Sequence, residues 1–171
     1  MTQREELDRL FKAFREDAPR SLVNFIVMLL IWLLWVLIYL PISNTIDASG
    51  NTTLTLGLII LSAFSVLIYK TSKRLGSGVE LFSSLLAKKY KKRELNYQES
   101  KLLFKNLILV ISSFIIALLY WPLLAPIHPA LYGFFLFFII IWIFYLLFKI
   151  LSILYLVILN RLTKTNKDLT R

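Results

Sequence analysis

Residues 130–148 read ALYGFFLFFIIIWIFYLLF and hold no charged side chain. A helix that crosses a membrane needs about 20 mostly apolar residues, because the hydrocarbon core is about 30 Å thick and a helix rises about 1.5 Å per residue. This stretch meets that requirement, and three others come close to it or meet it. The sequence therefore predicts four transmembrane helices, at about residues 22–41, 54–69, 106–127 and 130–148.

The composition of the whole chain supports the same class. Of its 171 residues, 58% are apolar, with 13 Phe, 8 Tyr and 4 Trp, whereas soluble domains are about half apolar. The apolar residues are also gathered into long blocks, and a soluble domain of this size could not bury such an excess. We therefore expect an all-α, polytopic membrane protein.

Lysine and arginine are confined to one side of the predicted helices. Of the 20 basic residues, five precede the first helix, ten lie within residues 70–105 and five follow from Lys149 onward. Cytoplasmic segments carry the excess of Lys and Arg, so both termini and the central loop are predicted to be cytoplasmic, in a cell or organelle membrane. The net charge of +10 then indicates attraction to anionic lipid headgroups, and we expect no nucleic-acid partner.

This topology divides the chain into five segments. They are a cytoplasmic amphipathic helix (1–18), a first transmembrane hairpin (19–70), a basic cytoplasmic loop with an amphipathic helix (71–104), a second hairpin (105–149) and an interfacial helix with a basic cytoplasmic tail (150–171). Lys149 is placed at the membrane boundary because a charge in mid-bilayer costs about 3 kcal/mol. A single overlong helix through Lys149 is the alternative.

The two hairpins resemble each other in sequence. Residues 37–41 (LIYLP) align with residues 118–122 (LLYWP), and in each the proline is predicted to end the outward helix at the headgroup level. The pattern predicts two copies of one hairpin in the same orientation, a parallel repeat whose axis lies along the membrane normal. Chance alignment of apolar segments is the alternative.

Two segments outside the predicted spans carry an apolar stripe at helical spacing. The first includes Leu7 and is expected to end at Pro19; the second follows a flexible stretch at residues 76–78. We expect both to lie on the membrane surface, with packing against each other or against a partner as the alternative. The residues assigned to the membrane surface are Phe11, Phe14, Phe82, Lys88, Lys89, Lys91, Lys92 and Arg93.

The start of the third transmembrane helix has a local signal of its own. Asn96 with Glu99 three residues later is the pattern of a capping box, in which each side chain bonds the backbone of the other residue. The helix is therefore predicted to begin near Tyr97, before the apolar stretch itself begins.

No pattern of residues indicates catalysis, a metal or a cofactor. The chain has no Cys, its single His128 lies in the turn after the third helix, and the predicted spans hold no Asp, Glu, Arg or His. Enzymes need an acid, base, nucleophile or metal ligand, so we expect no enzymatic activity and no cofactor. The polar candidates inside the spans are expected to serve helix packing or to line a pore, and they are Ser62, Ser65, Ser112 and Ser113.

These observations favour a non-enzymatic, multi-pass membrane protein that acts as an accessory or assembly subunit or as a membrane scaffold. The alternative is a small homo-oligomeric ion channel or transport pore, which needs several copies because four helices enclose no obvious aqueous path. The expected partners are a bilayer with anionic headgroups and either further copies of the chain or a larger membrane complex.

Overall fold

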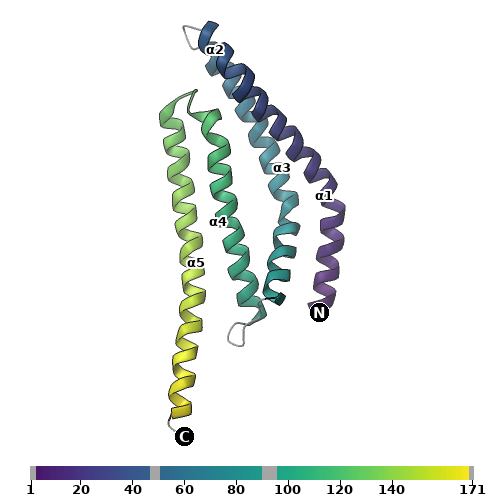
Figure 1. Ribbon diagram of the computed structural model, residues 1–171, viewed down its shortest axis with the longest axis vertical. Coiled ribbons are helices and arrows are strands. Elements are labelled where there is room, and N and C mark those ends of the chain that lie inside the picture. The colour runs from purple at the N-terminus through teal and green to yellow at the C-terminus, as the bar shows by residue number, and fades with distance from the viewer. Residues whose placement is uncertain (1–2, 47–50, 90–95, 170–171) are drawn as a thin grey trace.

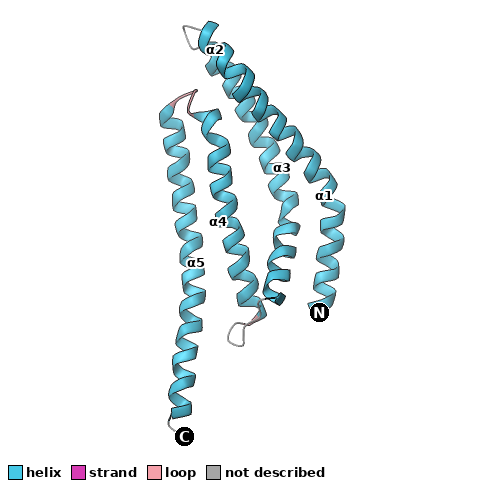
Figure 2. Cartoon of the chain, viewed as in Figure 1, coloured by secondary structure: helices cyan, strands magenta, loops and turns pink. Residues whose placement is uncertain are grey.

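The computed structural model describes residues 3–46, 51–89 and 96–169 (Figures 1 and 2). Apart from Asn96 and residues 125–128, every one of these is helical. The elements are α1 (Gln3–Leu34), the π-helical segment η1 (Trp35–Tyr39), α2 (Leu40–Ile46), α3 (Asn51–Lys89), α4 (Tyr97–Leu124) and α5 (Pro129–Leu169).

Four stretches of these helices are long and apolar enough to cross a membrane: Glu5–Ile42, Leu54–Lys89, Tyr97–Leu124 and Pro129–Leu159. The first of them runs through α1, η1 and the start of α2 without interruption. At this level the prediction of an all-helical chain with four transmembrane helices is confirmed, and the composition of the four helices is that of a multi-pass membrane protein.

The helices stand side by side in the order α1, α3, α4 and α5, and each packs on the next (Figure 1). The N and C labels lie at one end of the bundle, whereas the α4–α5 turn and the close approach of α2 to the start of α3 lie at the other. We call these the basic end and the turn end, because Lys12, Lys101 and Lys105 belong to the helix segments nearest the N and C labels.

The helices at the basic end continue where breaks were predicted. The prediction that the first helix ends at Pro19 is wrong, because α1 runs through this residue. Proline lacks the N–H that would bond the carbonyl of Arg15, but both residues are exposed, so polar surroundings can solvate that carbonyl. The prediction of a flexible stretch at residues 76–78 is likewise wrong, since these residues lie within α3.

Gly78 has a packing role in α3. A Cβ atom built on it would lie 3.0 Å from Cε2 of Phe14, so glycine allows the ring of α1 to approach the backbone of α3. Gly57 plays the same part at the turn end, where a Cβ would lie 2.9 Å from Cγ1 of Ile127 and 3.2 Å from Cη2 of Trp35. The contacts of Phe14 with Gly78 and of Trp35 with Gly57 fix the antiparallel register of α3 against α1 and η1.

The start of α4 and the course of α5 were predicted with different success. The capping box is confirmed: α4 begins at Tyr97, and the N–H of Asn96 donates to Oε2 of Glu99 at 3.0 Å. By contrast, α5 does not end or bend into a separate segment at Lys149 (Figure 1). The Lys149 ammonium lies 4.7 Å from the centre of the Tyr145 ring, so the charge stays on an exposed face while the helix continues.

The two prolines expected to end the outward helices do not do so. The chain stays helical past Pro41 to Ile46, and α4 continues past Pro122 to Leu124. Ahead of Pro41, the helix widens into η1, where the N–H of Leu40 bonds the carbonyl of Trp35. This i→i+5 bond adds one residue to the turn, and the rings of Trp35 and Tyr39 stack with their centroids 4.6 Å apart.

The core at the turn end is built around Trp35, whose side chain is fully buried against Phe64 and Leu123. Its indole Nε1–H donates to the carbonyl of Pro122 at 2.8 Å. That carbonyl has no donor within its own helix, because the residue four positions later is Pro126, which has no N–H. The indole therefore satisfies a backbone group that the sequence leaves without a partner.

We expect Trp35→Phe to lower the free energy of unfolding by about 1–3 kcal/mol more than Trp32→Phe does, because it leaves the partly buried carbonyl of Pro122 without a donor. Trp32 is the matched control: its Nε1–H donates at 2.9 Å to the carbonyl of Leu119, which still has Leu123 as a helical donor. Stability is measured by denaturant unfolding in detergent micelles.

A second substitution isolates the carbonyl from the lost ring volume. Pro126→Ala restores an N–H that can donate to the carbonyl of Pro122. Combined with Trp35→Phe, it should recover part of the lost stability, whereas combined with Trp32→Phe it should recover little. Equal recovery in both backgrounds would show that the Pro122 carbonyl is not what the indole stabilises.

Candidate functional site

Four hydroxyl side chains gather where α3 and α4 pack. The register of the two helices is set by two pairs: the Tyr120 hydroxyl donates to Oγ of Ser65 at 2.9 Å, and Nζ of Lys105 lies 2.9 Å from Oε1 of Glu80. The same antiparallel register places the four hydroxyl residues between these pairs and level with one another. They are Thr71 and Ser72 on α3 and Ser112 and Ser113 on α4, and we call them the hydroxyl cluster.

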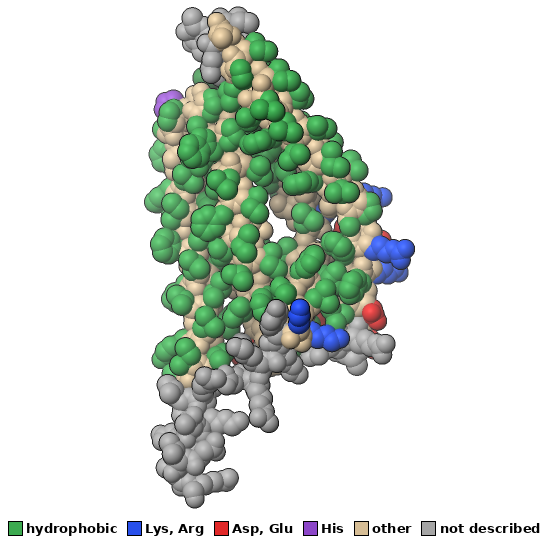
Figure 3. Space-filling view, viewed as in Figure 1, with side chains coloured by type: hydrophobic (Ala, Val, Ile, Leu, Met, Phe, Trp, Pro, Cys, Tyr) green, Lys and Arg blue, Asp and Glu red, His purple; other side chains and the backbone are tan. Residues whose placement is uncertain are grey.

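All four residues line a groove of about 320 Å³ to which four helices contribute. Its walls are otherwise apolar and include Met28 of α1, Leu75 of α3, Ile116 of α4 and Trp142 of α5. In the space-filling view, the apolar surface is hollowed between α4 and the pair formed by α1 and α3 (Figure 3). A cavity of this size with a few polar groups is typical of a small-molecule site.

The hydroxyls differ in how they are satisfied. Ser113 donates to the carbonyl of Leu109 at 2.9 Å, within its own helix. Thr71 is 5% exposed and Ser21, on the facing side of α1, is 3% exposed, yet neither hydroxyl has a hydrogen-bond partner. Burying an unsatisfied hydroxyl costs about 1–3 kcal/mol. At one edge of the groove, Thr71 therefore holds a buried hydroxyl that the described part of the chain does not satisfy.

Two of the four predicted serines belong to the groove. Ser112 and Ser113 line it, whereas Ser65 accepts the hydrogen bond of Tyr120 and Ser62 is exposed and donates to the carbonyl of Leu58 at 2.8 Å. The structure does not bring Ser62 together with the others. Sequence reasoning missed Thr71, because it follows the Lys70 taken as the membrane boundary. An antiparallel alignment of residues 71–72 with residues 112–113 would have shown the pairing.

Two ion pairs tie the helices together toward the basic end. Lys101 of α4 pairs with Glu6 of α1, and Lys105 of α4 pairs with Glu80 of α3. The hydrogen bond from Lys105 lowers the pKa of the Glu80 carboxyl, although partial burial opposes the shift. Glu80 lies beyond the apolar part of α3, and its side chain is about two-fifths exposed. Pairs this exposed contribute at most about 1 kcal/mol each, so their main effect is on the orientation of the helices.

The residues assigned to the membrane surface do not all face outward. The rings of Phe14 and Phe82 meet edge to face with their centroids 6.4 Å apart, so the alternative in which the two stripes pack on each other describes this contact, and Phe82 is still 56% exposed. Phe11 is 49% exposed, and Lys88 and Lys89 are exposed at the end of α3. The remaining three, Lys91, Lys92 and Arg93, lie outside the described residues. Whether any of these residues touches a membrane stays a prediction.

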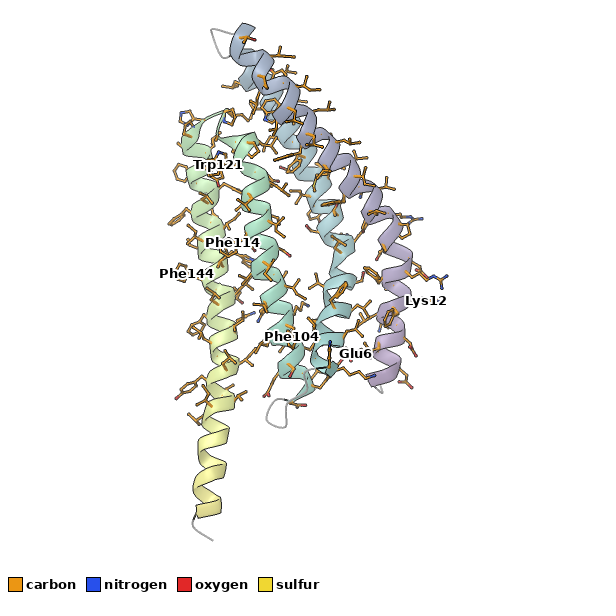
Figure 4. All side chains as sticks on the ribbon, viewed as in Figure 1. Glu6, Lys12, Phe104, Phe114, Trp121 and Phe144 are labelled. Atoms are coloured by element: carbon orange, nitrogen blue, oxygen red, sulfur yellow. The ribbon has the colours of Figure 1, made fainter. Side chains whose placement is uncertain are left out.

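The side-chain view shows the same arrangement for two charged residues of α1. Glu6 points toward α3 and α4, whereas Lys12 points away from the bundle (Figure 4). The first half of α1 therefore has a packed face and an outer face, and it belongs to the bundle rather than forming a separate helix.

A cross-linking experiment tests this packing directly. The chain has no cysteine, so the pair Phe14→Cys and Phe82→Cys supplies its only two thiols. We expect a short bis-maleimide to join them within one chain, because the two rings are in contact, and to join the control pair Lys12→Cys and Phe82→Cys poorly. The product is read as a mobility shift on a denaturing gel. Equally poor reaction of both pairs would contradict the packed arrangement.

Other types of site find less support among the described residues. No group of three or more His, Cys, Asp or Glu side chains there could hold a metal ion. His128 lies exposed in the α4–α5 turn, where its Nδ1 accepts a hydrogen bond of 3.2 Å from the N–H of Ala130. A comparison of the chain with known protein families, with curated proteins and with solved structures found no match.

Proposed function

We propose that this chain is a non-enzymatic accessory or scaffold subunit of a membrane, and that it acts through the lipid-embedded surface of α5. The observation that carries the proposal is the exposure of large aromatic side chains along this helix. Five phenylalanines are between 58% and 70% exposed: Phe134, Phe137, Phe138, Phe144 and Phe148.

The position of α5 in the bundle supports the same proposal. It stands at the edge of the row and packs on α4 (Figure 1), through a stripe that includes Ile143 and Leu146. Association of helices in a membrane depends on close side-chain packing, because lipid tails are as apolar as leucine. A partner helix can therefore lie along the outer face of α5 without displacing any contact within the chain.

The charge distribution supports an orientation for the proposed subunit. The N and C labels lie at the same end of the bundle (Figure 1), which is what an even number of membrane crossings requires. With ten basic residues in the central segment and none in the two turns at the other end, we propose that the basic end faces the cytoplasm and meets anionic headgroups.

The alternative of a homo-oligomeric pore receives less support from the serines. Ser65 and Ser113 hold hydrogen bonds to Tyr120 and Leu109, respectively, and the hydroxyl of Ser62 bonds its own helix. Hydroxyls engaged in this way serve packing, and a water-filled path lined by all four serines would need a different arrangement of α3.

The proposal predicts a mass larger than one chain when the protein is extracted from its native membrane in mild detergent. The additional mass should be a different membrane protein, and the substitutions Phe137→Ala with Phe144→Ala on α5 should remove it. Native mass spectrometry and gel filtration measure the mass before and after the substitution.

The matched control is Leu30→Ala on α1 with Leu37→Ala on η1, a pair with the same spacing in sequence, at 53% and 66% exposure. This variant should keep the partner. Recovery of homo-oligomers that pass ions, with no other protein bound, would support the pore instead.

A further inference from the structure

We propose that the groove between α3 and α4 binds one acyl chain of an anionic phospholipid from the leaflet at the basic end. The lipid headgroup lies beside the hydroxyl cluster, and the chain runs along the apolar walls toward the turn end. Three observations carry this assignment: the lining of the groove, the unpartnered hydroxyls and the charges on the same turns of α3.

The groove extends on both sides of the hydroxyl cluster. Its lining extends from Ile68 to Val79 along α3 and from Leu109 to Leu119 along α4. From the hydroxyl cluster toward the turn end, the lining continues along α4 from Ser113 to Leu119, about 9 Å at about 1.5 Å per residue. The part of a lipid chain next to its headgroup fits this stretch.

The lining matches a lipid chain in chemistry as well. Beyond the hydroxyl cluster, the groove is lined by aliphatic and aromatic side chains, including Met28, Ile115 and Leu119. Its wall also includes Trp142, which is 50% exposed, so the groove continues into the outer apolar surface of the bundle. A lipid can therefore enter sideways from the bilayer without passing through water.

The unpartnered hydroxyls mark where the polar part of the lipid lies. Thr71 lines the groove, is nine-tenths or more buried and leaves its Oγ1 without a partner. Ser21 is level with it on α1 and is also without a partner. A threonine in a helix can bond a carbonyl of the preceding turn, and Thr71 does not. The ester and phosphate oxygens of a phospholipid are acceptors that would satisfy such donors.

The charges near these hydroxyls favour an anionic headgroup. Lys70, Lys73 and Arg74 lie on the same turns of α3 as Thr71, and Arg20 directly precedes Ser21. Residues 65–79 of α3 hold no acidic side chain, and residues 106–119 of α4 hold no charge at all. None of these basic residues lines the groove, but basic residues at the surface of a bilayer attract anionic lipids, so the surface around the groove favours a phosphatidylglycerol-like head over a zwitterionic one.

The test uses the full chain in nanodiscs made from equimolar phosphatidylcholine and phosphatidylglycerol. After transfer to mild detergent, native mass spectrometry counts the phospholipids that remain bound. We expect the unmodified chain to retain one phosphatidylglycerol. Ser112→Phe should reduce retention to background, because the added ring fills the groove, whereas Ser62→Phe, the same change on the exposed face of α3, should leave it unchanged.

A second pair of variants keeps the test independent of packing defects. Thr71→Val preserves the volume of the side chain and removes its hydroxyl, so retention should fall about fivefold, the equivalent of one hydrogen bond. Thr45→Val is the control, since the Thr45 hydroxyl bonds the carbonyl of Ile42 at 2.7 Å, far from the groove. Circular dichroism and gel filtration verify that each variant remains folded.

Neutralising Lys73 and Arg74 with Lys73→Gln and Arg74→Gln should abolish the preference for phosphatidylglycerol, whereas Lys12→Gln with Arg15→Gln should not. An unmodified chain that retains no lipid, equal retention by Ser112→Phe, or equal retention of both lipids would overturn the proposal. The proposal would also be overturned if the unmodified chain bound a protein in place of the lipid and Ser112→Phe did not bind that protein.

Discussion

Everything in this fold depends on the requirement that each backbone N–H and C=O finds a partner where water is absent. Helices meet it internally, which is why nearly every described residue is helical. The exceptions are instructive. Pro126 removes the donor for the carbonyl of Pro122, and the Trp35 indole takes its place at 2.8 Å. A buried aromatic residue on η1 thus completes the backbone of α4, so the two hairpins are joined by a bond that neither could make alone.

The membrane class, the number of long apolar helices and the start of α4 could be predicted from the sequence, because each depends on local composition or on a short motif. Residues 130–148 need no partner to be recognised as a spanning helix, and Asn96 with Glu99 acts within one turn. The continuation of α1 through Pro19 and of α3 through residues 76–78 depends on contacts with the neighbouring helix, such as Phe14 against Gly78. Those contacts join residues distant in sequence, and no local rule reports them.

The same limit explains what was missed in the groove. Ser112 and Ser113 were recognised because they interrupt an apolar run, whereas Thr71 follows a lysine and was taken to lie outside the membrane. Only the register between α3 and α4, set by Ser65 with Tyr120 and by Glu80 with Lys105, shows that the hydroxyls share one level. A basic residue therefore marks the approximate level of the headgroups on one helix, and the helix beside it can still be apolar at that level.

The lengths of the helices add a last constraint. At about 1.5 Å per residue, the 39 residues of α3 span about 58 Å, which is well beyond a hydrocarbon core of about 30 Å. The excess lies at the basic end, where Glu6 and Glu80 pair with lysines of α4 and where Phe14 packs on Phe82. These contacts hold three helices in line after they leave the apolar region. On α3 and α4 they begin just beyond Val79 and Leu109, the lining residues of the groove nearest the basic end, so the groove ends where these contacts start.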